Sequence, residues 1–379
     1  MQPLKGVKVL EMARILAGPW IGQVLSDLGA TVIKVESPSG DDTRGWGPPF
    51  IERGEDPSAA YFYTCNRGKK SIAVDFTTPE GQALVRDLAS EADILIENFK
   101  VGGLKKYGLD FDSLHALNPR LVYCSITGFG QDGPYATRAG YDYLVQGMAG
   151  LMSITGDEHG EPSKVGVAVT DIVAGLYGVI GIQAALHQRD ETGLGQHIDV
   201  SLFDGATALL ANQAMNFLAT GTAPTRLGNK HPNIVPYQVF EVADGQIIIA
   251  AGNDGQYRRL CGVLGADELA ENPDYAKNRD RVRNREVLVP KLAEAMVGWT
   301  RADLLAALEK AVVPSAPINS VAEVFDDPQI RFREMAIQPE GVPGFRSPLS
   351  MSDSDLNLEN TAPLLDQHGD AIRAKGWDA

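Results

Sequence analysis

Residues 7–36 open with Val7-Lys8-Val9-Leu10-Glu11 and close with Ala30-Thr31-Val32-Ile33-Lys34-Val35-Glu36, two short β patterns. Between them, Trp20 to Leu28 has helical spacing, so the stretch predicts a β-α-β unit. Further strands are predicted at Ser71 to Asp75, Asp93 to Ile96 and Leu121 to Ser125. Strands that alternate with helices form a mostly parallel sheet. The first 130 residues are therefore predicted to be α/β.

Helix signals extend this pattern along the chain. Thr78-Pro79-Glu80 predicts a helix start, with threonine as the cap and proline at the first helical position. Two long helices are predicted at 171–188 and 202–219, with a strand at 196–200 between them. All of these elements belong to a predicted large domain, residues 1–220.

A smaller α+β domain is predicted to follow at residues 221–326. Residues 221–236 carry three prolines and little periodicity, which is typical of a crossing between domains. A hairpin is predicted across Ala243-Asp244-Gly245, and helices are predicted near 255–264, 286–297 and 301–310. Residues 327–379 are rich in turns and are predicted to return to the large domain.

Composition restricts the partners of the chain. Its 379 residues include 34 Lys and Arg against 49 Asp and Glu, a formal net charge of −15. This balance disfavours nucleic acid or an anionic membrane as a partner. The N-terminus lacks a signal-peptide pattern, and the longest apolar stretch, 172–186, is too short to span a bilayer. An anionic ligand would need a local basic cluster.

Cysteine and histidine give no sign of a metal site. Cys65, Cys124 and Cys261 are far apart, which indicates reduced residues in a cytoplasmic protein. The six histidines lack metal-ligand spacing, and we predict no metal. Among them only His231, in the crossing between domains, is a candidate site residue.

The strand-turn-helix start resembles a dinucleotide site but departs from it where the phosphates would bind. Glu36 lies about 20 residues beyond the turn, as the nicotinamide fingerprint requires. The turn itself, Ala13 to Pro19, holds one glycine where that motif needs three, and Pro19 removes an N–H donor. We therefore do not expect a nicotinamide cofactor.

Asp171 stands where a β pattern changes to an apolar helix containing Gly175, Gly178 and Gly181. One interpretation is an N-cap, since Asp is a favoured capping residue. The other is a carboxylate nucleophile at a helix N-terminus. The basic pairs Lys69-Lys70 and Lys105-Lys106 are either solvated or local anchors for a polyphosphate.

Taken together, these segments resemble the class III CoA-transferases. The matching stretches, in chain order, are Leu4 to Glu11, Ala17-Gly18-Pro19, Leu28 to Glu36, Asp42 to Trp46, Asn66 to Ser71, Glu97-Asn98-Phe99, Gly193 to Gln196 and Ala362 to His368. The resemblance implies a Rossmann-like large domain with a parallel sheet, a smaller domain inserted late, and an interlinked homodimer.

The resemblance also implies site residues. Asp171 matches the nucleophile of the family. Coenzyme A contacts fall on Ile15, Leu16, Ala17, Lys69, Lys70, Asn98, Phe99 and Lys106. The acyl site falls on Trp46, Tyr61, Tyr141 and Asp142. Coenzyme A would be a substrate and not a resident cofactor: Asp171 would attack an acyl-CoA thioester, carry CoA as an aspartyl thioester, and pass it to an incoming acid.

Two departures and two alternatives bear on the function. Residues 228–238 stand where formyl-CoA transferase has a glycine-rich loop, which favours a succinyl-CoA donor and a dicarboxylic acceptor over oxalate. Ser37 stands where formyl-CoA transferase has an arginine beside the adenine of coenzyme A. Arg14 and His231 are candidates to hold the distal carboxylate of the acceptor.

A 2-methylacyl-CoA racemase would use a Gly-His-Asp motif, which is Gly140-Tyr141-Asp142 here. A non-catalytic CoA-binding protein is the other alternative.

Overall fold

The computed structural model describes residues 1–54 and 57–379, and the chain divides into two units. Unit 1 comprises Met1–Leu151, Lys164–Thr222 and Pro328–Ala379. Unit 2 comprises Met152–Ser163 and Ala223–Asp327. Residues 152–163, expected in the large domain, thus belong to unit 2. The segment from Pro328 onward belongs to unit 1, together with the first 151 residues.

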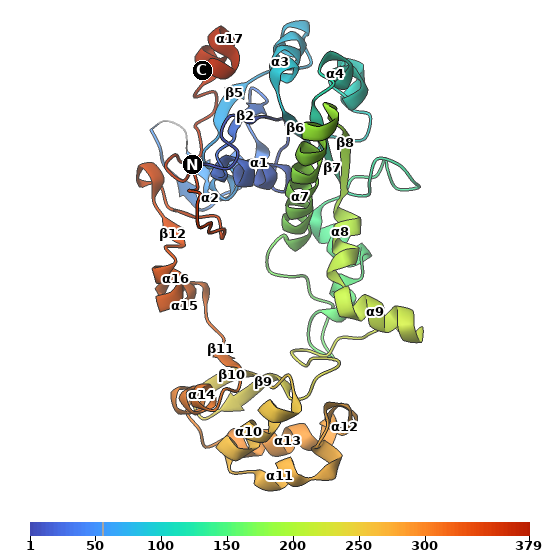
Figure 1. Cartoon of the computed structure of the whole chain (residues 1–379), viewed down its shortest axis with the longest axis vertical. Helices are drawn as coiled ribbons and strands as arrows, with labels where there is room; N and C mark the ends of the chain where they lie inside the picture. The colour runs from blue at the N-terminus through green and yellow to red at the C-terminus, as the bar shows by residue number, and fades with distance from the viewer. Residues whose placement is uncertain (55–56) are drawn as a thin grey trace. The chain divides into compact units, whose positions relative to one another are not determined.

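Six parallel strands form the central sheet of unit 1 (Figure 1). Their order across the sheet is β5 (Lys70–Ala73), β2 (Thr31–Glu36), β1 (Lys8–Glu11), β6 (Ile94–Glu97), β7 (Val122–Thr127) and β8 (His197–Ser201). Every neighbouring pair is parallel. The chain order of the strands reverses between β1 and β6, as in doubly wound Rossmann sheets. The predicted α/β fold with a parallel sheet is confirmed.

Unit 1 contains helices that the sequence predicted and others that it did not. They are α1 (Ala17–Asp27), α2 (Ala60–Tyr63), α3 (Pro79–Glu91), α4 (Phe111–Leu117), α5 (Asp142–Met148), α7 (Val169–Thr192), α8 (Leu202–Leu209), α9 (Ala211–Thr220), α16 (Pro328–Phe332) and α17 (Gly369–Lys375). The helices that the sequence predicted are α1, α3, α7 and the α8–α9 stretch. The predicted cap of α3 is present, because Thr78 Oγ1 accepts a hydrogen bond from Gly81 N at 3.1 Å. The helix predicted at 202–219 is instead broken into α8 and α9, since Ala211 has a φ of 44°.

Short elements complete the chain. The α6 helix (Leu151–Ile154) spans the point in the sequence where the chain passes from unit 1 to unit 2. Two pairs of two-residue strands are antiparallel: β3 (Phe50–Ile51) with β4 (Ser58–Ala59), and β12 (Ala336–Ile337) with β13 (Gly344–Phe345). Single turns of 3₁₀ helix lie at Asp42–Gly45, Lys105–Tyr107, Pro273–Tyr275, Pro339–Gly341 and Gly376–Asp378.

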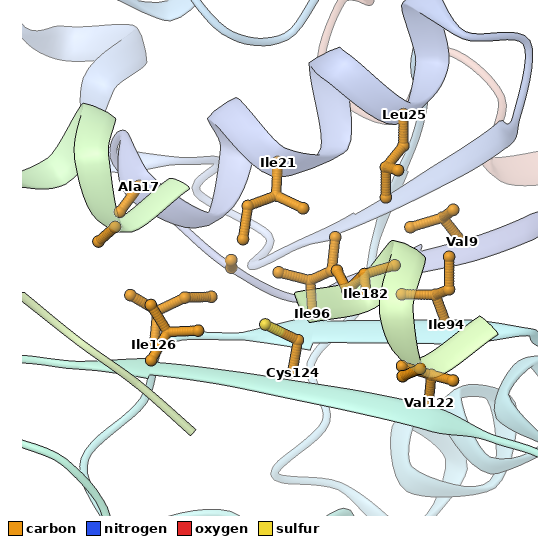
Figure 2. Close-up of a cluster of buried hydrophobic side chains, with 14 of the residues drawn as sticks. Val9, Ala17, Ile21, Leu25, Ile94, Ile96, Val122, Cys124, Ile126 and Ile182 are labelled. Atoms are coloured by element: carbon orange, nitrogen blue, oxygen red, sulfur yellow. The ribbon is translucent and has the colours of Figure 1, made fainter. Parts of the chain in front are cut away.

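The sheet strands are apolar on both faces because both faces are covered. On one face, Val9 and Ile94 pack with Ile21 of α1 and Ile182 of α7 (Figure 2). Gly178 permits the close contact between these two helices, since a Cβ there would lie 2.3 Å from Ile21 Cδ1. The opposite face forms a second core with α3, α4 and α17. Alternate strand residues thus build two separate cores.

The long helix α7 is the only described helix whose length and composition would suit a membrane span. It extends over 24 residues, so the length argument made from residues 172–186 is wrong. One such helix is weak evidence for a membrane protein, because the core helix of a protein passes the same test. Here Ala174, Ile182 and Ala185 belong to the core of unit 1.

Unit 2 is built on a three-stranded antiparallel sheet. Its order is β11 (Ser315–Pro317), β10 (Gly245–Ala250) and β9 (Tyr237–Val242), and the predicted hairpin between β9 and β10 is confirmed. Its helices are α10 (Asp254–Leu264), α11 (Asp267–Glu271), α12 (Asn278–Arg283), α13 (Arg285–Met296), α14 (Arg301–Lys310) and α15 (Val321–Asp326). The predicted α+β character of this region holds.

The C-terminal segment covers β5, an edge strand of the large sheet. Ala73 N donates to Asp366 Oδ1 at 2.7 Å, and His368 N donates to Ser71 O at 3.0 Å. Further on, Trp377 Nε1 donates to the carbonyl of Leu88 in α3 at 3.0 Å. The last residues of the chain are thereby attached to β5 and to α3.

A buried ion network lies beneath the turn that follows β1. We call it the Glu11 network, and it consists of Glu11, Lys34, Asp41 and Lys69, each at most 3% exposed. Lys34 Nζ lies 3.0 Å from Glu11 Oε1 and 3.0 Å from Asp41 Oδ2. Lys69 Nζ lies 2.7 Å from Glu11 Oε2. Two carboxylates therefore face two ammonium groups, which is how buried charges are tolerated.

The same network holds the turn between β1 and α1. Lys34 Nζ donates to the carbonyl of Ala13 and Lys69 Nζ to that of Pro19, each at 2.9 Å. Ile15 has a left-handed φ of 73°, unfavourable for a β-branched residue. Its N–H donates to the Asp41 carboxylate at 3.2 Å, which compensates for that strain. Buried charge therefore fixes the backbone of residues 13–19.

We predict that Lys69→Met lowers the free energy of unfolding by about 3–5 kcal/mol, because it leaves Glu11 buried without one of its counter-charges. The matched control is Lys5→Met, which removes an exposed lysine and is expected to change stability by about 0.5 kcal/mol or less. Urea unfolding of both variants measures the difference. Equal stability of the two variants would show that the network does not hold the fold.

Candidate active site

A cavity lies at the carboxyl ends of the central strands, where the strand order reverses. It has a volume of about 530 Å³ and is lined by residues that follow β1, β6 and β7, together with Asp171 of α7. In doubly wound sheets, ligands bind at such a reversal because the loops on either side diverge there. All of its walls come from unit 1.

Most of the residues selected from the sequence come together at this cavity. Those that line it are Arg14, Ile15, Leu16, Ala17, Asn98, Phe99, Lys106, Tyr141 and Asp171. They lie far apart in the sequence and meet because β1 and β6 are neighbours in the sheet. The side chain of Asn98 also joins the two loops, since it bonds both Arg14 N at 2.9 Å and Arg14 O at 2.7 Å.

The cavity wall is rich in positive charge despite the acidic composition of the chain. Arg14, Lys100, Lys106 and Arg138 all line it. Arg14 also pairs with the exposed Asp42 at 3.0 Å. Lys100 and Arg138 were not singled out from the sequence, although each is a basic residue in a loop shortly after a strand. The cavity can therefore accept an anionic, polyphosphate-bearing ligand.

Asp171 is the one carboxylate among the lining residues. It occupies the third position of α7 and no donor hydrogen-bonds it within the described part of the chain. The N-cap is Ala168, and the carboxylate that caps the helix belongs to Asp142, whose Oδ1 accepts from Thr170 N at 2.8 Å. The interpretation of Asp171 as an N-cap is therefore wrong.

Burial and the nearby Asp142 carboxylate raise the pKa of Asp171 from its ordinary 3.8 to about 7. Tyr61 of α2 is coupled to it: burial, and then the charge of Asp171, raise the pKa of Tyr61 to about 12. Trp46 contacts Tyr61 edge-on, with ring centroids 5.4 Å apart. Two of the three aromatic residues expected at the acyl site thus pack together, and one of them, Tyr61, interacts electrostatically with Asp171.

The sequence model of CoA-transferase family III matches residues 4–369. The chain belongs to CoA-transferase family III. A "Succinate--glutarate CoA-transferase" of Agrobacterium fabrum is 54% identical over 98% of this chain and 95% of its own length. A human "Succinyl-CoA:glutarate CoA-transferase" is 40% identical over 97% of this chain and 84% of its own length. A solved CAIB/BAIF family protein from Brucella suis is 60% identical with a TM-score of 0.89, covering 98% of this chain and 99% of that one.

The resemblance seen in the sequence is thus confirmed, and the chain is a CoA-transferase. Its curated relatives carry names of transferases, which favours CoA transfer over the racemase alternative. Across residues 1–54 and 57–379, no group of three or more His, Cys, Asp or Glu side chains is placed to hold a metal ion.

Two basic residues assigned to coenzyme A make internal contacts instead. In this CoA-transferase Lys69 is buried, and its ammonium bonds Glu11, Pro19 O and Asn66 Oδ1. Assigning the Lys69 side chain to coenzyme A is therefore wrong. The Lys70 ammonium donates to the backbone oxygen of Ala379, and Lys70 is not among the residues that line the cavity.

His231 and Asp142 have partners of their own. His231 belongs to unit 2, where its Nδ1 accepts from Asn233 N at 3.0 Å and its ring contacts Tyr237. Burial lowers the pKa of His231, followed by the charge of Arg285. Asp142 bonds to the start of α7 and is absent from the cavity wall.

We predict that Asp171→Asn stabilises the protein more at pH 8 than at pH 5. The native pKa of Asp171, about 7, exceeds its ordinary 3.8, so the folded state binds this proton more tightly and loses stability as the pH rises from about 4 to 7. Asparagine carries no charge, so the variant does not lose stability for this reason as the pH rises. Thermal unfolding at both pH values measures the effect, and an equal change at both would contradict the buried-charge assignment.

Proposed function

We propose that this CoA-transferase moves CoA from succinyl-CoA to a small dicarboxylic acid such as glutarate, through a thioester on Asp171. The observation that carries the proposal is the unpaired Asp171 carboxylate in the wall of a cavity rimmed by basic residues. The names of the relatives from Agrobacterium fabrum and human support the choice of donor and acceptor.

The reaction starts when an Asp171 oxygen attacks the carbonyl carbon of succinyl-CoA. The C–S bond breaks, and the products are a succinyl-aspartyl anhydride and the CoA thiolate. The thiolate then attacks the carbonyl of Asp171, which releases succinate and leaves an aspartyl-CoA thioester. The acceptor carboxylate attacks the carbonyl of that thioester and breaks its C–S bond, which gives an acceptor-aspartyl anhydride and the CoA thiolate. The thiolate then attacks the acceptor carbonyl of this anhydride, which forms the new acyl-CoA and releases the Asp171 carboxylate.

The surroundings of Asp171 suit this chemistry. A carboxylate with a pKa of about 7 is more basic, and so more nucleophilic, than an ordinary aspartate. Its place in the first turn of α7 lets the helix dipole stabilise negative charge there. Its partial burial limits the access of water, which would hydrolyse both the anhydride and the thioester.

Coenzyme A is proposed to enter as substrate along the rest of the cavity, and no permanently bound cofactor is invoked. The phosphates would lie near Lys106, Arg138 and Lys100, while Ile15, Leu16, Ala17 and Phe99 would pack against the uncharged parts. Each cation would then form charge-assisted hydrogen bonds with phosphate oxygens. The four basic side chains at the wall, Arg14 included, are the local cluster that an acidic chain needs for such a ligand.

The second carboxylate of the acceptor is proposed to be held by the Arg14 guanidinium on the cavity wall. The Arg14 guanidinium is half exposed and engages Asp42, an exposed carboxylate that an anionic acceptor can displace. Trp46, Tyr61 and Tyr141 are proposed to shape the acyl site. Relatives from Acetobacter aceti and Haloarcula hispanica are named for oxalate and mesaconate, and both of these acids are dicarboxylates.

The active form is proposed to be a cytoplasmic homodimer that binds neither membrane nor nucleic acid. Support for the dimer comes from large apolar side chains exposed on helices of unit 1, among them Tyr143, Leu144, Leu176, Tyr177 and Ile180. Such clusters commonly mark protein interfaces. The net charge of −15 supports the absence of nucleic-acid binding.

We predict that incubation with succinyl-CoA and hydroxylamine places a hydroxamate on Asp171, because hydroxylamine cleaves the aspartyl thioester. Peptide mass spectrometry locates the modification, and Asp171→Asn serves as the control that gives none. Modification of a different carboxylate would refute Asp171 as the nucleophile. Tight CoA binding without either modification or transfer would support the non-catalytic alternative.

We predict that glutarate is a better acceptor than pentanoate, its monocarboxylic counterpart, by at least about tenfold in kcat/KM with succinyl-CoA as donor. The second carboxylate gains charge-assisted hydrogen bonds, and about 1.4 kcal/mol of such binding gives that factor. Initial rates with both acids measure the ratio. Equal rates for the two acids, or a strong preference for oxalate, would remove the proposed acceptor class.

A further inference from the structure

Asp142, the first residue of α5, uses both carboxylate oxygens to hold the segment that leads into α7. Its Oδ1 accepts from Thr170 N at 2.8 Å and from Thr170 Oγ1 at 2.7 Å. Its Oδ2 accepts from Gln146 Nε2 at 2.8 Å. Thr170 is fully buried and directly precedes Asp171.

Gln146 extends this attachment by one turn of α5. Its side chain is fully buried, and its Oε1 accepts from Val165 N at 2.9 Å. Asp142 and Gln146 together therefore fix the backbone at both ends of residues 165–170. The direction in which α7 begins, and with it the position of Asp171, depends on two side chains of α5.

We propose that Asp142 is a positioning residue for Asp171: it caps α7 in place of Asp171 and holds a second negative charge beside the nucleophile. This inference rests on the function proposed above. It assigns Asp142 a contact with the protein and not, as the family resemblance implies, with the acyl group.

The capping role leaves the nucleophile unpaired. The N-cap of α7, Ala168, has no side-chain acceptor for the free N–H groups of the first turn. An acidic residue at the third position, where Asp171 lies, can itself fold back onto such N–H groups. Because Asp142 already accepts from Thr170, Asp171 remains available to attack a thioester.

The charge of Asp142 acts on Asp171 directly. After burial, it is the group that raises the pKa of Asp171. The other titratable or charged side chains facing this region are Tyr61 on α2 and, on the cavity wall, Arg14, Lys100, Lys106, Tyr107, Arg138 and Tyr141. Tyr61, with a pKa of about 12, stays neutral across the working range of pH. Removing the Asp142 charge should therefore make Asp171 less basic.

The test compares Asp142→Asn, which keeps an oxygen acceptor for Thr170 but loses the charge, with Asp142→Ala, which loses both. Asp190→Asn is the matched control, since it removes an exposed carboxylate near the far end of the same helix. The pH dependence of kcat/KM and kcat is measured for each, together with thermal unfolding. Wild type should show kcat/KM rising with pH through about 7, as Asp171 ionises.

For Asp142→Asn we expect the midpoint of that rise to move down by about one pH unit, because a like charge has been removed. For Asp142→Ala we expect the same shift and an additional fall in kcat of about 10- to 100-fold, because the nucleophile is displaced. Asp190→Asn should match wild type. If Asp142→Ala fails to fold, the midpoint of Asp142→Asn still decides the question.

An unmoved midpoint in Asp142→Asn would overturn the inference, even if its unfolding temperature falls, because a purely structural role lowers stability without moving the titration. Wild-type kcat in Asp142→Ala would also overturn it. Asp171→Ala separates the two proposals: if it keeps transferase activity, the proposed function fails. If Asp171→Ala is inactive and the Asp142→Asn midpoint stays in place, only the positioning role fails.

Discussion

The contacts of Glu11 with Lys34 and Lys69 are the constraint on which the rest of the large unit depends. Burying a carboxylate costs several kcal/mol unless cations face it, and here the cations come from β2 and from the segment preceding β5. Three segments are thereby fixed to one point beneath the first turn. Because the same lysines bond Ala13 O and Pro19 O, the turn has little freedom. That turn supplies one wall of the cavity.

The parallel sheet determines where the candidate active site lies. Its order reverses between β1 and β6, so the loops after these strands separate and leave the space that becomes the cavity. The helix that carries Asp171 packs on α1, which follows the β1 loop, through Gly178 and Ile21. The nucleophile and the binding loop are therefore positioned by one packed interface, although 156 residues separate Ile15 from Asp171 along the chain.

The sequence was sufficient to predict the six strands of the large sheet, the small-domain hairpin and the place of Asp171 at a helix start, because apolar runs, turn residues and an acidic residue before an apolar helix are local signals. It was insufficient to predict that Lys69 is buried, since a lysine after a turn has the same sequence pattern whether it faces solvent or a carboxylate 58 residues earlier. The same holds for the cap of α7, which comes from Asp142 on another helix. Arg138 could not be predicted as a site residue, because only the fold brings its loop to the cavity.

The cover over β5 determines where the sheet stops. A parallel edge strand presents unpaired N–H and C=O groups that invite another chain to pair with it. Here those groups are occupied by side chains and single backbone atoms: Asp366 on Ala73 N, His368 Nδ1 on Ser71 N, and Arg373 on Ala73 O. None of these partners belongs to a strand, so none presents a new edge with which another chain could pair. At this edge the sheet is thereby closed to growth by polar side chains, and β5 is protected from edge-to-edge pairing without a seventh strand.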